Sequence, residues 1–483
     1  MSLPMPEINL IPMLPEIVIA LAALGLLLVG AWQEKHGGGS LVGFGTVLAI
    51  LLAALLTYGS GDDRITETFG GMFVADPFAS FMKMLMYAGA ILPILMSWDA
   101  LQRMDMLNGE YFVLNLFALL GGMIMASSGD FLTLYMGLEM MSLSIYVLAG
   151  YRRDNALANE AGLKYFILGS MASGLFLYGV SLIYGATGGI TFSGIQEAML
   201  AGGSAHMGTR LGVILVISGL AFKVAAAPFH MWSPDVYEGS PTPVTAFMSA
   251  LPKIAGFAAI YRVLPGAFAS MHGQWGAVLQ FLSIISLAVG AFAAIPQTNI
   301  KRMLAYSSIG HVGYALIGLV PGTSLGYRSI LIYLAIYLFM NMGAFAVVLV
   351  LARDDVGESI QDYRGLAHKR PLLAAVMAIF MFSMAGIPPL AGFIGKLHIF
   401  MAAVNGGHVG LALAGVLFSA VAAFYYLRVV KVMYFEQPER GFQMRVGGFS
   451  GAVLALSTFL VLFWGVQPGR LLAWAEASVT SFM

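Results

Sequence analysis

"LGVILVISGLAFKVAAAPFHMW", residues 211–232, is uncharged for twelve residues and then places Lys223 within the same apolar stretch. Pro228 and His230 follow shortly after the lysine. A buried ammonium group is costly, and a proline inside a helix removes a backbone hydrogen bond. Positions that break local rules in this way are usually functional. The stretch therefore predicts a membrane helix that is interrupted beside a functional lysine.

The composition of the whole chain is that of a membrane protein. Of its 483 residues, 59% are hydrophobic and 10% are charged, whereas about a quarter of the residues in a soluble domain are charged. A helix that crosses a bilayer needs about 20 mostly apolar residues. Fourteen runs of this kind occur, at approximately 14–31, 40–58, 78–97, 111–127, 131–150, 163–185, 210–230, 243–263, 276–295, 303–321, 328–352, 372–402, 408–434 and 449–466. Because these runs lack the alternation of barrel strands, we predict an all-α polytopic membrane protein.

The chain has little room for anything besides these helices. No stretch between them is long enough for a soluble catalytic domain or a nucleotide-binding fold, so we expect a single membrane domain over residues 1–483. The absence of cysteine excludes iron–sulfur clusters held by cysteine. No spacing of histidines and carboxylates suggests a metal site. We therefore expect neither a cofactor nor a metal in this chain.

Basic residues predict the orientation of the chain in the membrane. The first thirteen residues contain no Lys or Arg, so the first helix is not expected to be a cleaved signal peptide. If the N-terminus lies outside, fifteen basic residues fall in inner loops and helix ends, and five fall in outer ones. Basic residues favour the cytoplasmic side. We therefore expect a multi-pass protein of the bacterial inner membrane with both termini on the periplasmic side.

Four ionisable residues lie in the middle of predicted helices, namely Glu139, Lys223, Lys253 and Lys396. A charge at the centre of the bilayer costs about 2.5–3.5 kcal/mol on insertion scales, and such residues usually mark ion pathways. A buried lysine can release its proton near neutral pH and regain it when a carboxylate approaches, whereas arginine stays charged. We therefore interpret these four residues as proton-transfer sites. Lys83, near the outer start of its helix, is interpreted instead as an isolated or snorkelling structural residue.

Two predicted helices contain breaks close to their lysines. Pro228 follows Lys223, and the motif "GIPPLAG" at 386–392 precedes Lys396. Interrupted helices at corresponding positions are typical of inverted repeats in transporters. Because the breaks lie in helices 7 and 12, we predict two inverted five-helix repeats, helices 4–8 and helices 9–13. The expected division of the chain is 1–110 for helices 1–3, 111–263 and 276–434 for the two repeats, and 435–483 for helix 14.

Three histidines are weaker candidates for the same chemistry. His311 lies in "SSIGHVGYALIGL" at 307–319, while His230 and His398 lie close to the two helix breaks. Histidine titrates near pH 6.5 and suits a proton relay. A hydrogen-bonded histidine in an apolar core is the commoner role for such a residue. Both interpretations stay open for His311, His230 and His398.

Several motifs resemble one known family. The stretches "FKVAAAPFHMWSPDVYEGSPTPVTAF" (222–247), "KRMLAYSSIGHVGYALIGL" (301–319) and "GIPPLAGFIGK" (386–396) resemble the antiporter-like subunits of respiratory complex I, the bacterial NADH:quinone oxidoreductase. "LPEIVIALAALGLLLVG" (14–30), "GLEMMSLSIYVLAGY" (137–151) and "LKYFILGSMASGLFLYG" (163–179) are similar to the subunit N branch of that family. The resemblance covers nearly the whole chain.

This resemblance implies a function and roles for residues. The chain would translocate protons while other subunits, carrying FMN, iron–sulfur clusters and quinone, oxidise NADH and reduce quinone. The helix-5 glutamate of the family falls on Glu139 and its helix-7 lysine on Lys223, and these two would form a coupling ion pair. Lys253 would be the central relay and Lys396 the outward-facing terminal site. The expected partners are other membrane-arm subunits and the lipid bilayer, with no nucleic acid.

Two alternatives to this function remain open at the level of sequence. One is a subunit of a cation/proton antiporter, which would exchange Na⁺ or K⁺ along the same polar residues. The other, weaker one is a membrane scaffold whose buried charges have no function. The motifs of helices 7 and 12 are shared by the enzyme subunit and the antiporter, whereas those of helices 1, 5 and 6 favour the enzyme subunit.

Overall fold

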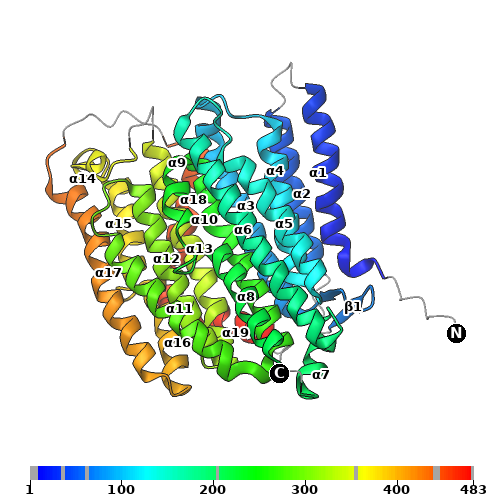
Figure 1. Ribbon diagram of the computed structural model, residues 1–483. Coiled ribbons are helices and arrows are strands. Elements are labelled where there is room, and N and C mark those ends of the chain that lie inside the picture. The colour runs from blue at the N-terminus through cyan, green and yellow to red at the C-terminus, as the bar shows by residue number, and fades with distance from the viewer. Residues whose placement is uncertain are drawn as a thin grey trace.

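The structure is a computed structural model, which describes residues 9–33, 39–59, 65–202, 206–352, 357–438 and 446–479. Nearly all of the described chain is helical (Figure 1). The helices are α1 (Leu14–Gln33), α2 (Gly39–Gly59), α3 (Pro77–Arg103), α4 (Gly109–Ser127), α5 (Phe131–Ala149), α6 (Ala156–Thr187), α7 (Phe192–Leu200), α8 (Met207–Val224), α9 (Trp232–Gly239), α10 (Thr242–Tyr261), α11 (His272–Ala293), α12 (Ile300–Leu319), α13 (Ser324–Leu351), α14 (Leu366–Lys369), α15 (Pro371–Ala385), α16 (Ala391–Asn405), α17 (Val409–Phe435), α18 (Gly448–Val466) and α19 (Gly469–Val479). Two short strands, β1 (Thr66–Thr68) and β2 (Phe73–Ala75), pair antiparallel with Thr66 opposite Ala75.

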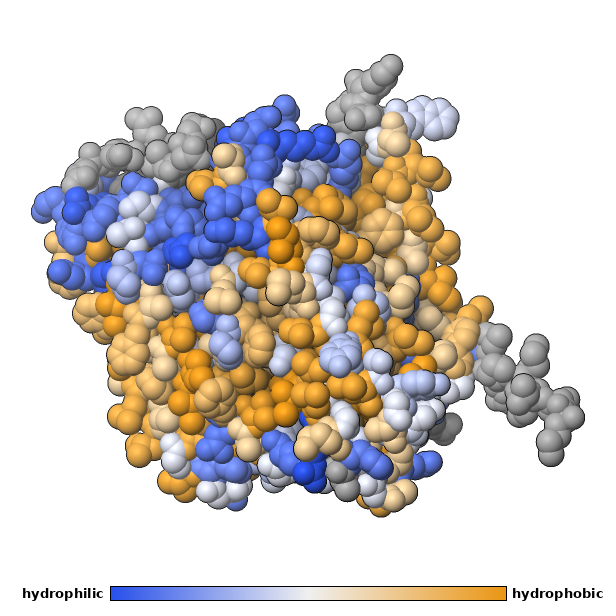
Figure 2. Space-filling model, in the orientation of Figure 1, coloured by the Kyte–Doolittle hydropathy of each residue, from blue (hydrophilic) through white to orange (hydrophobic). Residues whose placement is uncertain are grey.

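The membrane-spanning character of the fold is confirmed. Among the described residues, twelve helices are long and apolar enough to cross a membrane. The two remaining expected crossings are α12 and the pair α15 and α16, which are two shorter pieces of one interrupted span. Figure 2 shows an apolar band across the face in view, with polar residues above and below it. Among the described residues, each of the fourteen apolar runs of the sequence thus falls on a helix or, for 372–402, on a pair of helices.

Polar residues at several helix starts explain where these helices begin. Asp76 accepts a hydrogen bond from the Ala79 N–H at 2.7 Å at the start of α3. Asp130, Asn155 and Asn299 do the same for α5, α6 and α12. Such caps satisfy N–H groups that have no partner within the helix.

The helices α10 and α13 form the centre of the bundle. Their membrane-spanning windows are entirely buried. The peripheral helices α1, α2, α17 and α18 expose large apolar side chains instead, among them Leu28, Leu55, Leu417 and Phe459. A side chain within these windows is therefore shielded from the surroundings on every side.

Both expected helix breaks are confirmed. Helix α8 ends at Val224, where Ala225 adopts a left-handed backbone with φ 61°. Helix α15 ends at Ala385, where Gly386 adopts the same region with φ 89°. After each break the chain turns and begins a second helix, α9 with 8 residues or α16 with 15. Each interruption leaves helix-terminal carbonyl groups within the bundle.

Arg103, Arg152 and Lys301 line one cavity at one end of the bundle, which we call the basic end. It is the upper end in Figure 1. It contains the C-terminus of α3 and the first turns of α6 and α12. Its residues are Arg103, Arg152, Arg153, Lys164 and Arg302.

Candidate functional site

Lys223 is held by hydroxyl groups of α5. Its side chain lies in the last turn of α8 and is 3% exposed. The Nζ atom donates to Ser142 Oγ at 2.8 Å and to Tyr146 Oη at 3.1 Å. It also lies 5.6 Å from the centre of the Tyr146 ring. Lys223 is thus solvated by neutral groups.

Glu139 lies one turn before Ser142 and two turns before Tyr146 on the same face of α5, because residues spaced by three and seven share a helix face. Its carboxylate accepts a hydrogen bond from Ser173 of α6. It lies within electrostatic range of Lys223. Among the ion pairs of the described residues, however, none joins Glu139 to Lys223. The structure places Ser142 and Tyr146 around the ammonium group instead of the carboxylate.

Lys253 is buried at the centre of the bundle on α10, with 3% of its surface exposed. Its Nζ donates to the hydroxyl of Tyr237, which comes from α9, at 2.5 Å. Tyr237 also faces Ser308 of α12. Ser308 in turn bonds to Tyr337 of α13 at 2.7 Å. A line of hydroxyl groups therefore leads from Lys253 into the second half of the chain.

His311 lies on α12 beside Tyr337, where this line ends. Its Nδ1 lies 2.6 Å from Tyr333 Oη, and its Nε2 lies 3.1 Å from Tyr426 Oη. Its ring centre is 5.0 Å from that of Tyr337. Tyr426 of α17 also bonds to Ser307 at 2.5 Å. Both ring nitrogens of His311 therefore have a hydroxyl partner through which a proton can pass.

Lys396 binds the carbonyl end of the broken helix α15. Its Nζ donates to the carbonyls of Met384 and Ala385 at 3.0 and 3.1 Å, and to Ser419 Oγ at 2.8 Å. These carbonyls carry the negative end of the helix dipole, which favours an ammonium group. The Nζ also lies 4.6 Å from the ring centre of Tyr314. The break between α15 and α16 thus creates the binding place of Lys396.

A small cavity connects His311 and Lys396. Its volume is about 10 Å³, and its lining includes His311, Tyr314, Lys396 and Tyr426. A space of this size holds about one water molecule, and its polar lining offers partners for one. One water between the two residues would extend the hydrogen-bonded line to the terminal lysine.

Other sequence candidates lie apart from this line. His230 is partly exposed in the turn between α8 and α9, and His398 is partly exposed on α16. Among the hydrogen bonds of the described residues, none joins either histidine to the lysines. The interpretation of Lys83 as an isolated or snorkelling residue is wrong. Lys83 is buried and forms an ion pair with Glu16 of α1, with Nζ and Oε1 2.6 Å apart, which offsets the cost of its charge.

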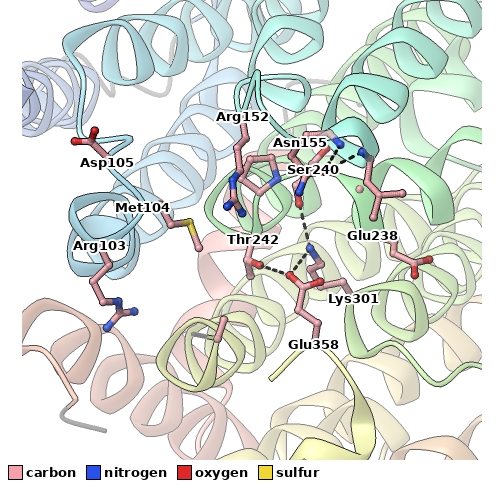
Figure 3. Close-up of a pocket in the computed structure, with 15 residues that line it drawn as sticks. Arg103, Met104, Asp105, Arg152, Asn155, Glu238, Ser240, Thr242, Lys301 and Glu358 are labelled. Carbon is pink, nitrogen blue, oxygen red and sulfur yellow. Dashed lines mark hydrogen bonds and ion pairs between the residues drawn. The ribbon is translucent and has the colours of Figure 1, made fainter. Parts of the chain in front are cut away.

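The basic end holds a cavity of about 280 Å³, shown in Figure 3. Lys301 and Glu358 line it and form an ion pair with an N–O distance of 2.6 Å. Lys301 also donates to the Ser240 carbonyl at 3.1 Å, and Thr242 donates to Glu358 at 3.1 Å. Ser240 is separated by only two residues from Tyr237, the partner of Lys253. The cavity at the basic end therefore borders the segment of chain that directly follows Tyr237.

Sequence reasoning missed the hydroxyl groups around the lysines. Tyrosine and serine are common in apolar helices and do not interrupt the hydrophobic pattern. One signal was available in α13, where Tyr333, Tyr337 and Asn341 recur every four residues and so form a polar stripe on one helix face. A second lay in α5, where Ser142 and Tyr146 follow Glu139 at helical spacing.

A family model and several full-length sequences of known proteins match this chain. The family model described as "NADH:quinone oxidoreductase/Mrp antiporter, TM" matches residues 128–422. A protein of Magnetococcus marinus named NADH-quinone oxidoreductase subunit N is 55% identical over 483 residues, 100% of both chains. A protein of the same name from Rhodospirillum rubrum is 49% identical over 469 residues, 97% of this chain and 96% of the relative.

Two solved structures have a fold similar to that of this chain. A chain of respiratory complex I from Thermus thermophilus has a TM-score of 0.82 and 33% identity, and the match covers 96% of this chain and 100% of that one. A chain of the Mrp complex from Dietzia sp. has a TM-score of 0.82 at 20% identity, covering 97% of both. The second likeness concerns the fold alone.

Proposed function

We infer the function from one premise: the chain belongs to the family of NADH:quinone oxidoreductase and Mrp antiporter membrane subunits. It is a proton-translocating membrane subunit of NADH:quinone oxidoreductase. The observation that carries this conclusion is the row of buried titratable side chains, Lys223, Lys253, His311 and Lys396, with hydroxyl partners along it. Relatives that are 43–55% identical are named as oxidoreductase subunits, which favours the enzyme over the free-standing antiporter.

We assign the roles along the row as follows. Glu139 sets the charge balance around Lys223 at one end, through the carboxylate that Ser173 holds. Lys253 is the central relay, and it exchanges its proton through the Tyr237 hydroxyl. His311 passes protons between the tyrosine cluster and Lys396, which is the terminal site. His230 has no assigned step.

The chemistry of the lysine sites supports a relay. Lys223 and Lys253 have neutral hydroxyl partners rather than a carboxylate within ion-pair distance. A lysine without a fixed counter-ion is less strongly held in the charged state, because burial disfavours charge. A negative charge that comes near such a lysine favours its protonated form, and withdrawal of that charge favours release of the proton. Such a group can load and unload within the membrane.

The surroundings of the row suggest where protons are taken up. We place the basic end on the cytoplasmic side, since basic residues favour that side, and both termini on the periplasmic side. The cavity beside Lys301 and Glu358 would admit water from the cytoplasm toward Tyr237. NADH oxidation and quinone reduction, with FMN and iron–sulfur clusters, belong to other subunits. Neighbouring membrane subunits and lipid cover the apolar lateral faces.

We also propose that the predicted membrane crossings 4–8 and 9–13 form inverted repeats, 111–263 (α4 to α10) and 276–434 (α11 to α17). The two breaks support this division, because α8 and α15 both end in a left-handed residue and are followed by a short helix. Each break lies beside a lysine of the row. The remaining parts, 1–110 and 435–483, would pack around the repeats.

Lys223→Ala tests the assigned function. We expect the assembled complex to lose about tenfold in NADH-driven proton pumping, because one proton-transfer group is removed from the row. The measurement is acidification of proteoliposomes that contain the purified complex. Its assembly is verified by co-purification with flavin and iron–sulfur signals and by NADH oxidation with an artificial acceptor. Normal pumping by an intact complex, or purification of the chain with small membrane proteins only, would refute the assignment.

Gly386→Ala tests the importance of the break between α15 and α16. A Cβ atom at this position would lie 3.0 Å from Lys396 Cδ and 3.3 Å from its Nζ, at a backbone φ of 89°. A left-handed L-residue costs about 1 kcal/mol, which corresponds to about fivefold in a rate when the strain falls on the reacting group. We expect pumping to fall about fivefold. Gly410→Ala on α17, where no atom lies within 4 Å, should leave pumping unchanged, and equal pumping by both variants would contradict the prediction.

A further inference from the structure

Helix α9 lies between two lysines of the proposed row. It is eight residues long, with the break after α8 on one side and the turn before α10 on the other. Isolated helices of this length are not stable in themselves. The position of α9 is therefore set by contacts with other helices.

Two side chains of α9, Trp232 and Tyr237, contact the two lysine sites. Its Trp232 donates from Nε1 to the Phe222 carbonyl, next to Lys223, at 3.0 Å, and its ring stacks on Tyr165 of α6 at 4.1 Å. Its Tyr237 holds the ammonium group of Lys253. Trp232 and Tyr237 are both fully or nearly fully buried. A shift of α9 would therefore change the surroundings of both lysines.

Two further side chains of α9, Asp235 and Glu238, are carboxylates that form ion pairs with cations of two other helices. Asp235 Oδ2 lies 2.7 Å from Lys164 Nζ of α6, and its Oδ1 lies 2.6 Å from Arg302 Nη1 of α12. The same Arg302 nitrogen lies 3.0 Å from Glu238 Oε2. One carboxylate thus bridges α6, which carries the partner of Glu139, and α12, which carries His311.

We propose that Asp235 is a positioning residue that joins the two halves of the chain and fixes α9, so that the Tyr237 hydroxyl stays on Lys253. The inference rests on the proposed proton relay. Hydrogen bonds weaken steeply as their geometry departs from the optimum. A displacement of α9 would therefore lengthen the hydrogen bond between Lys253 and Tyr237 and slow proton transfer through it.

The principal test is Asp235→Asn in the assembled complex. The amide keeps the shape of the side chain but loses the charge that holds both cations. We expect NADH-driven pumping to fall about tenfold, as misplacement far from the chemistry commonly costs, and Asp235→Glu to restore most of it. The control is Glu160→Gln. Glu160 lies on α6, and its Oε1 forms another ion pair with Lys164 Nζ at 2.7 Å. That variant should pump normally.

A double-variant cycle separates positioning from general stabilisation. If Asp235 acts through Tyr237, Asp235→Asn should lower pumping little further in a Tyr237→Phe background, whereas independent effects would multiply. If Asp235→Asn fails to assemble, Lys164→Gln is the alternative variant. It removes one of the two cations that bind Asp235, and the Lys164 side chain is 41% exposed. Pumping should then fall about threefold. Normal pumping by the assembled variants, or multiplying effects in the cycle, would overturn the inference. If Lys253 variants also pumped normally, the relay itself would be refuted, whereas normal pumping by the Asp235 and Lys164 variants alone would refute only the positioning role.

Discussion

Lys253→Met is expected to lower NADH-driven proton pumping about a hundredfold while the complex still assembles, because general acid–base groups typically contribute 10²–10⁴-fold to a rate. Methionine has nearly the length of lysine and fills the same buried space on α10. It removes a charge that is costly in the membrane, so the variant should fold. The hydroxyl line from Tyr237 to Ser308 then has no group that can hold a proton at its centre.

A matched control exists elsewhere in the same chain. Lys83 is buried to the same extent as Lys253 but pairs with Glu16, away from the row. The double variant Lys83→Met with Glu16→Gln therefore removes a buried lysine and its counter-ion together. We expect this control to pump at the wild-type rate. Equal losses in both variants would show that the effect arises from removing buried charge in general rather than from the relay.

The second large effect is expected for Lys396→Arg. Arginine keeps the positive charge and can still donate to the Met384 and Ala385 carbonyls that bind Lys396. Its guanidinium group does not release a proton in proteins. Assembly should therefore be normal, while pumping should fall about a hundredfold. The measurement is pumping by reconstituted complex with assembly verified by its flavin content.

Arg428 supplies the corresponding control. It lies on α17 and donates to the carbonyls of Ile295 and Gln297, each at 2.5 Å, apart from the row. Arg428→Lys makes the reverse exchange at another cation that binds carbonyl groups. We expect it to pump normally. If Lys396→Arg also pumped normally, Lys396 would be a structural cation rather than the terminal proton site.

The sequence predicts the fold and the charged members of the row for the same physical reason. A charge within an apolar run, as at Lys223 or Lys396, is visible without any structure because the bilayer makes it exceptional. Proline likewise reveals the helix breaks, because it cannot continue the hydrogen-bond ladder. Membrane helices are therefore easier to locate from sequence than the contacts among them.

The contacts that complete the site depend on which helices become neighbours. Asp235 and Lys164 are 71 residues apart, and nothing in either segment identifies the other as its partner. The hydroxyl partners of His311 come from α13 and α17 and resemble ordinary residues of apolar helices. The partner of Lys83 was missed for the same reason, since Glu16 lies in another helix. Packing decides these pairs, and hydropathy does not encode them.

The most direct test of the row as a proton pathway is the number of protons translocated per NADH oxidised, measured in proteoliposomes containing the Lys253→Met complex. Turnover that persists in this variant should translocate fewer protons per NADH than the wild type, because one pathway is interrupted. An unchanged ratio in an assembled complex would show that protons do not pass through Lys253, and it would contradict the proposed function of the row.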